Sequence, residues 1–189
     1  MKGITADLAL KVKVMLGFVS ILWAVEIVNL VLGYELNRFG IIPREITGLR
    51  GLVFSPFLHG SINHLMLNTA PLFVLGLFVI SRGIRSFFML TFAVSVAGGL
   101  GVWCVGQPNS VHVGASGVIF SYFGFLLFKG IFDKQLTALL VSVGVFIIYG
   151  GMIWGVFPGS AGVSWEGHLF GFLAGIGWAY LTRYKRANA

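Results

Sequence analysis

Charged residues are scarce in this chain. Only 10% of its 189 residues are Asp, Glu, Lys or Arg, whereas 57% are hydrophobic. Soluble domains carry about 25% charged residues. Together with a mean hydropathy of +0.93, this composition excludes a soluble globular domain and predicts an integral membrane protein.

The chain also lacks the residues that several catalytic centres require. Cys104 is the only cysteine, which excludes an intramolecular disulfide and a thiolate metal cluster. The His-Glu-x-x-His string of zinc proteases is absent. Asp7 and Asp133 fall outside the apolar stretches, so an intramembrane aspartyl protease is excluded. Glu26 lies within an apolar stretch with Asn29 one turn later. We interpret it as making a buried hydrogen bond to the first loop, with catalysis as the alternative. We expect neither a metal nor a cofactor.

Six apolar stretches are long enough, or nearly so, to cross a bilayer. They cover approximately residues 14–32, 62–80, 86–104, 116–128, 136–153 and 168–182. The expected fold is an all-α, six-helix membrane bundle forming a single domain over residues 1–189. Lysines lead directly into the first stretch, so we expect a retained span rather than a cleaved signal peptide.

Basic residues outnumber acidic ones and give a formal net charge of +7. In a membrane protein this excess predicts cytoplasmic loops and contact with anionic lipid, not a nucleic-acid partner. Ten basic residues fall in four segments that share one side of a six-span topology. They are Lys2, Lys11, Lys13, Arg82, Arg85, Lys129, Lys134, Arg183, Lys185 and Arg186. Both termini are therefore expected in the cytoplasm. The long first loop, 33–61, is an exception, because it carries three arginines on the opposite side.

The fourth apolar stretch is short. Between Gly114 and Lys129 there is helix for only about 20 Å, against a hydrocarbon core of about 30 Å. If Lys129 lies near the cytoplasmic surface, this helix begins below the outer surface. The irregular segment 106–110 then reaches membrane depth, where it is tolerated only beside protein or a water-filled cavity. The sequence thus predicts a short, partly sunken fourth helix with Ser116 at the floor of a polar hollow.

The second, fourth and sixth stretches begin on the same side, and each start carries polar residues. His64 and Asn68 are four residues apart and share a helical face. Ser116 and His168 begin the other two stretches. This set fits a nucleophile (Ser116), a base (His168) and oxyanion donors (Asn68, His64 and the Ser116 N–H). A structural hydrogen bond between His64 and Asn68 is an equal alternative, and His59 and His112 are interpreted as loop or interfacial residues.

Small residues suggest how the nucleophile and the base could meet. In the sixth stretch small residues recur every four positions, at Gly167, Gly171 and Gly175. The fourth stretch has a similar row of small residues, Gly117, Ser121 and Gly124. Such residues let membrane helices approach closely. Packing without catalysis explains the glycines equally well, but it does not explain the histidine.

The motifs Gly114-Ala115-Ser116-Gly117, Gly167-His168-Leu169-Phe170-Gly171 and His64-Leu65-Met66-Leu67-Asn68 together resemble the rhomboid family of intramembrane serine proteases. The resemblance covers essentially the whole chain. It implies a Ser116–His168 dyad without an acidic member, and an oxyanion hole completed by His64 and Asn68. It also implies that Phe120 packs on the catalytic imidazole.

Two positions depart from the family pattern. Leu49-Arg50 stands where the family usually has Trp-Arg, so Arg50 is the matching residue while the tryptophan is missing. Gly167 stands where Ala often precedes the catalytic histidine, and it is still small enough for a tight helix contact.

The resemblance implies cleavage of a transmembrane protein substrate that enters from lipid. The alternative function is a non-proteolytic rhomboid-like membrane chaperone, although such a protein would be expected to lose the nucleophile or the base. A transporter is a third class, but it predicts polar residues through the full bilayer depth. The compact chain favours a prokaryotic plasma membrane. The sequence sets neither the oligomeric state nor the substrate.

Overall fold

The computed structural model describes residues 2–159 and 162–184. Within these ranges the chain is helical, with one isolated antiparallel bridge between Ile41 and His112. The α-helices are α1 (Lys2–Val31), α2 (Gly51–Phe54), α3 (Ile62–Ile80), α4 (Ile84–Val105), α5 (Ser116–Asp133), α6 (Leu136–Tyr149) and α7 (Trp165–Leu181). Short 3-10 helices are η1 (Glu35–Phe39), η2 (Ile46–Arg50), η3 (Ser55–Phe57) and η4 (Gly150–Val156).

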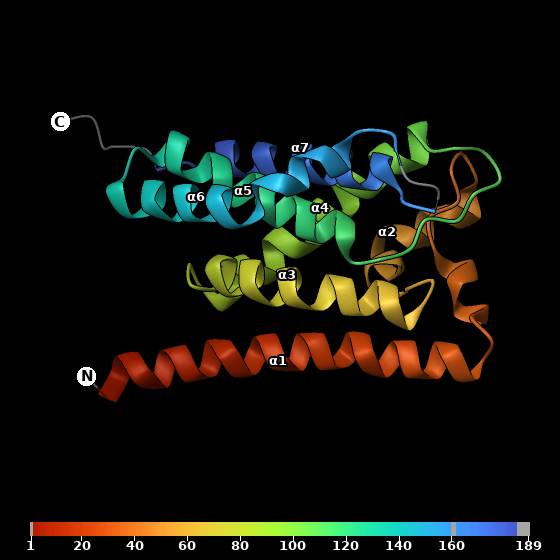
Figure 1. Ribbon diagram of the computed structural model, residues 1–189, viewed down its shortest axis with the longest axis horizontal. Helices are drawn as coiled ribbons and strands as arrows, with labels where there is room; N and C mark the ends of the chain where they lie inside the picture. Colours follow the sequence, from red (N-terminus) through yellow and green to blue (C-terminus); the bar gives the residue numbers. More distant parts are fainter. Residues whose placement is uncertain (1, 160–161, 185–189) are drawn as a thin grey trace.

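Helix α5 lies at the centre of the bundle. It packs against α7, α6, α3 and α4, whereas α1 forms an outer layer against α3 (Figure 1). Of the α5 segment, 67% is buried, against 33% or less for the other long apolar helices. Because α5 begins at Ser116, this residue starts the most enclosed helix of the fold.

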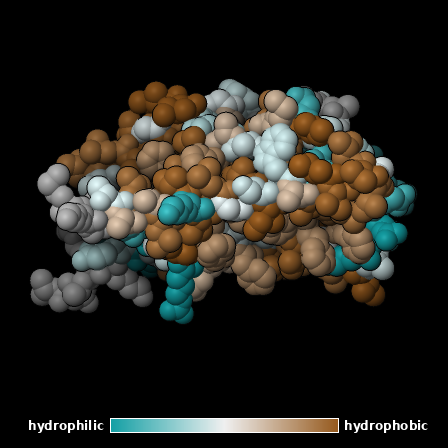
Figure 2. Space-filling view, turned by 90° about the horizontal axis from the view of Figure 1, so that it is seen from below, coloured by the Kyte–Doolittle hydropathy of each residue, from teal (hydrophilic) through white to brown (hydrophobic). Residues whose placement is uncertain are grey.

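Within the described residues, five helical segments are long and apolar enough to cross a membrane: α1, α3, α4, α5, and α6 together with η4. Helix α7 has 17 residues and lies along α5. Large apolar side chains such as those of Val31, Phe92 and Ile147 are exposed. In Figure 2, which views the α1 side, hydrophobic surface covers most of the visible face. This protein is therefore an integral, multi-pass membrane protein.

The α5 helix is longer than its apolar stretch predicts. It continues past Lys129 to Asp133, which gives 18 residues and a length of about 27 Å. Lys129 is 4% exposed and lies inside the helix, so its placement in a surface loop is wrong. Its ammonium is 3.1 Å from Asp133 and donates to the carbonyl oxygen of Thr182 at the end of α7. These partners compensate the charge and allow the helix to continue.

The expectation that Asp7 and Asp133 fall outside the apolar spans is wrong, because the candidate spans in α1 and α5 include both residues. Asp7 pairs with Lys11 in α1 at 2.6 Å, and Asp133 pairs with Lys129. Each carboxylate therefore has a lysine four residues away, and neither takes part in an aspartate pair. Two of the basic residues expected on the cytoplasmic side, Lys185 and Arg186, lie outside the described residues.

Asn29 ties the first loop to α1. The Asn29 side chain donates to Asn37 at 2.9 Å and accepts from the Leu36 N–H at 3.0 Å. Glu26 is fully buried, and its carboxylate lies beside Asn29 and beside Tyr34 of the first loop. Glu26 thus faces the first loop as expected, although the short hydrogen bonds to that loop come from Asn29.

Candidate active site

A cleft of about 1150 Å³ opens where α3, α5 and α7 begin. Five of the residues proposed from the sequence line it: His64, Asn68, Ser116, Phe120 and His168. A smaller cavity of about 50 Å³ lies beside it, and Gly114, Gly117 and Gly171 line that cavity. Ser116 lines both, so this residue lies at the junction of the two hollows.

The loop before α5 fixes the position of Ser116. Gly114 has φ +125°, a backbone conformation that L side chains rarely adopt. The Gly114 N–H donates to the Ser55 carbonyl oxygen at 2.9 Å, and the Ala115 N–H donates to Nε2 of His59 at 3.3 Å. The next N–H, that of Ser116, has no partner among the described residues. It is one of the free donors that every helix N-terminus leaves.

Helices α5 and α7 touch through glycine backbone. A Cβ atom on Gly171 would overlap the carbonyl oxygen of Gly117, and one on Gly175 would overlap that of Ser121. A Cβ on Gly117 would lie 3.4 Å from the Gly167 carbonyl oxygen. The two helices can therefore be this close only because glycine occupies the contact. This approach brings the first turns of α5 and α7 to the same cleft.

Two contacts orient the His168 imidazole. Its Nδ1 lies 2.9 Å from the carbonyl oxygen of Gly155, and its ring stacks on Phe120 with centroids 4.1 Å apart and planes 7° apart. A carbonyl oxygen only accepts, so Nδ1 carries the proton and Nε2 keeps its lone pair. No hydrogen bond joins His168 to Ser116 in the described part of the chain.

Asn68 offers an unused donor at the cleft. Its side chain is 7% exposed, and Nδ2 has no hydrogen-bond partner among the described residues. His64, one turn earlier, lies against the loop before α5, because a Cβ on Gly114 would be 2.8 Å from the His64 Cε1. A buried unpaired amide costs free energy unless a ligand uses it. The site thus holds a donor ready for an oxygen atom beside Ser116.

His59 lies in the loop between η3 and α3, as expected, but it is buried and not interfacial. It is 0% exposed, and its ring packs edge-on against His64 with centroids 5.2 Å apart. Burial lowers the pKa of His59 to about 4, so the ring is neutral at pH 7 and its Nε2 can accept from Ala115. His59 therefore supports the backbone immediately before the serine.

His112 connects the loop before α5 to the start of α7. Its Nδ1 is 2.6 Å from Ser164 Oγ and its Nε2 is 2.8 Å from Ser110 Oγ. Ser164 also caps α7 by accepting from the Gly167 N–H at 3.1 Å. Burial lowers the pKa of His112, partly offset by Glu166. The helix that carries His168 is thus tied to the loop that leads to Ser116.

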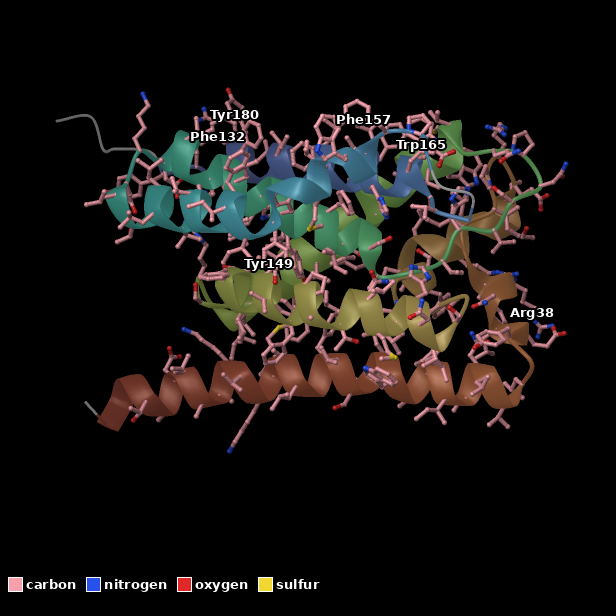
Figure 3. All side chains as sticks on the ribbon, in the orientation of Figure 1. Arg38, Phe132, Tyr149, Phe157, Trp165 and Tyr180 are labelled. Carbon is pink, nitrogen blue, oxygen red and sulfur yellow. The ribbon has the colours of Figure 1, made fainter. Side chains whose placement is uncertain are left out.

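Arg50 does not join this group. It donates to the carbonyl oxygen of Arg38 at 2.8 Å, and its guanidinium lies over the Phe39 ring at 4.6 Å from the centroid. Arg38 is labelled in Figure 3, in the first loop beyond the end of α1. Arg50 therefore braces the first loop and does not line the cleft.

Sequence reasoning missed Gly155, whose carbonyl oxygen contacts His168. Glycine is required there because a Cβ would lie 2.7 Å from the Phe120 ring and 3.3 Å from His168 Nδ1. The signal was weak, since several glycines occur in this apolar segment. Among the described residues no group of three His, Cys, Asp or Glu side chains is placed to hold a metal ion.

The family model for the rhomboid domain matches residues 47–185. An uncharacterized protein of Mycobacterium tuberculosis is 39% identical over 182 residues, which cover 92% of this chain and 76% of the relative. An uncharacterized Mycobacterium leprae protein is 36% identical over 88% of this chain and 69% of the relative. A Bacillus subtilis protein named "Putative rhomboid protease YdcA" is 26% identical over 71% of this chain and 68% of its own length. This chain belongs to the rhomboid family, whose members are usually intramembrane proteases.

Proposed function

We propose that this protein is an intramembrane serine endopeptidase with Ser116 as nucleophile and His168 as general base. One observation carries the proposal: the first turns of α5 and α7 bring both residues to one cleft, with the imidazole held by Gly155 and Phe120. Serine needs such a base because its hydroxyl is a weak nucleophile at neutral pH.

In the proposed reaction, Nε2 of His168 takes the Ser116 proton while Oγ bonds to the scissile carbonyl carbon. The tetrahedral intermediate collapses, the C–N bond breaks, and His168 returns the proton to the leaving amine. Water, deprotonated by the same nitrogen, then hydrolyses the acyl-enzyme. The Gly155 carbonyl oxygen accepts from Nδ1 and holds the tautomer, a role that a carboxylate has in a three-residue triad.

Oxyanion stabilisation falls to Asn68, His64 and the Ser116 N–H. The Asn68 amide and the Ser116 N–H are both without partners in the described structure, which supports this role. Losing one such donor typically lowers kcat by about 10²–10³-fold. Gly114, Gly117 and Gly171 act indirectly, because they permit the backbone positions that place the donors and the base.

The proposed substrate is a transmembrane segment of another membrane protein that enters from lipid. A favoured cleavage site has small or helix-weakening residues, because a stable helix hides its carbonyl groups in hydrogen bonds. We place the whole chain in one rhomboid-like domain of six spans, with α7 as the sixth, in a prokaryotic plasma membrane with both termini cytoplasmic. Helices α1 and α7 support this topology, since α1 begins and α7 ends at the same end of the bundle (Figure 1).

The experiment is labelling of purified protein with a fluorophosphonate, together with cleavage of a model transmembrane substrate. Wild type is expected to be labelled and to cleave, Ser116→Ala to do neither, and His168→Ala to lose cleavage while remaining folded. Equal labelling of wild type and Ser116→Ala contradicts the proposal. Substrate binding without Ser116-dependent cleavage would instead support the chaperone alternative.

A further inference from the structure

Glu166 lies in the first turn of α7, two residues before His168. It lines the same cleft as Ser116 and is 8% exposed. Trp165, the residue beside it, is labelled in Figure 3 at this end of α7. A carboxylate therefore borders the proposed reaction centre, and the reaction described above gives it no role.

The Glu166 carboxylate has no hydrogen-bond or ion-pair partner in the part of the chain that the structure describes. The buried acid Asp133 differs, because it pairs with Lys129 at 3.1 Å and Arg82 at 3.3 Å. Unlike the oxygens of Glu26, those of Glu166 are not enclosed, so the carboxylate faces the open cleft. It is therefore free to bind a cationic group from outside the chain.

Within the cleft, Glu166 is the one formally charged side chain among the described lining residues. The other polar groups are amides, hydroxyls and imidazoles. His112 does not compensate the carboxylate at neutral pH, since burial lowers its pKa. A single carboxylate without other ligands is also a poor metal site. The partner that fits this carboxylate is therefore an organic cation.

Provided that the cleft is the protease site proposed above, we infer that Glu166 binds a lysine or arginine side chain of the substrate close to the scissile bond. Both side chains have long apolar stems that can lie along the cleft wall while the charged head reaches the carboxylate. Glu166 thus selects substrates with a basic residue at one particular distance from the cleavage site.

The test uses model transmembrane substrates that carry one lysine at successive positions within four residues of the cleavage site. The matched substrates carry glutamine instead. For wild type, kcat/KM is expected to be about tenfold higher with lysine at one position, the size of one charge-assisted hydrogen bond. Glu166→Gln should lose this preference and Glu166→Lys should favour glutamate there. Raising the ionic strength should weaken the preference.

Glu45→Gln is the matched control, because it removes an exposed carboxylate of the first loop outside the cleft and should keep the preference. If Glu166→Gln slows the lysine and glutamine substrates equally, the carboxylate acts on the enzyme and not on the substrate, and the inference is overturned. Peptide affinities measured on Ser116→Ala give an answer without cleavage. Equal affinities overturn the inference, whereas absent Ser116-dependent cleavage overturns only the protease proposal.

Discussion

Adding one methyl group at Gly171 should separate the nucleophile from the base. The new Cβ would overlap the Gly117 carbonyl oxygen, which is backbone and cannot rotate away. Ordinary contact begins near 3.4 Å, so α5 and α7 must part by on the order of 1 Å. Overpacking of this kind costs about 1–3 kcal/mol, offset by about 0.5–1 kcal/mol from replacing glycine in a helix.

The effect on catalysis should exceed the effect on stability. His168 lies one turn before Gly171, and a displacement of about 1 Å can lower the rate about 10²-fold. Gly177→Ala is the matched control, because the same change on the same helix meets no atom within 4 Å. It should leave activity unchanged and stability equal or slightly higher.

The assay compares thermal unfolding in detergent with the initial rate of cleavage of a transmembrane substrate. Gly171→Ala is expected to lose most of its cleavage while still unfolding cooperatively. Equal rates for Gly171→Ala and Gly177→Ala would refute the argument that glycine contact sets the distance between Ser116 and His168.

Three further outcomes follow from single contacts. Phe120→Leu removes the ring stacked on His168, so kcat should fall several-fold with KM and unfolding little changed; an unchanged kcat would deny the ring an orienting role. His59 has a pKa of about 4 when folded and an ordinary value near 6.5 when unfolded, so its contribution weakens as the pH falls below about 6.5. Between pH 7.5 and 5, wild type should therefore lose about 2 kcal/mol more stability than His59→Gln, by denaturant titration, and parallel losses would contradict this. Lys129→Met leaves the Asp133 carboxylate without its closest cation, so unfolding should be easier by about 3 kcal/mol, whereas the exposed-site control Lys134→Met should change little.

The sequence was sufficient to predict the membrane class and the family. Long apolar stretches separated by basic loops indicate helices wherever they occur, because the bilayer satisfies no backbone hydrogen bonds. The motifs around His64, Ser116 and His168 needed only their order and spacing to indicate the rhomboid family. Each of these features is local in the chain.

Tertiary structure decided what depends on residues far apart in the chain. Helix α5 continues to Asp133 because Lys129 finds partners in its own helix and at the end of α7. His59 lies buried beside the loop before α5, where its Nε2 accepts a hydrogen bond from the Ala115 N–H. Likewise, the Gly155 carbonyl oxygen meets His168 only after η4 packs against α7. Composition and spacing carry the hydrophobic signal that selects the fold, but the partner of a buried polar group is set by packing.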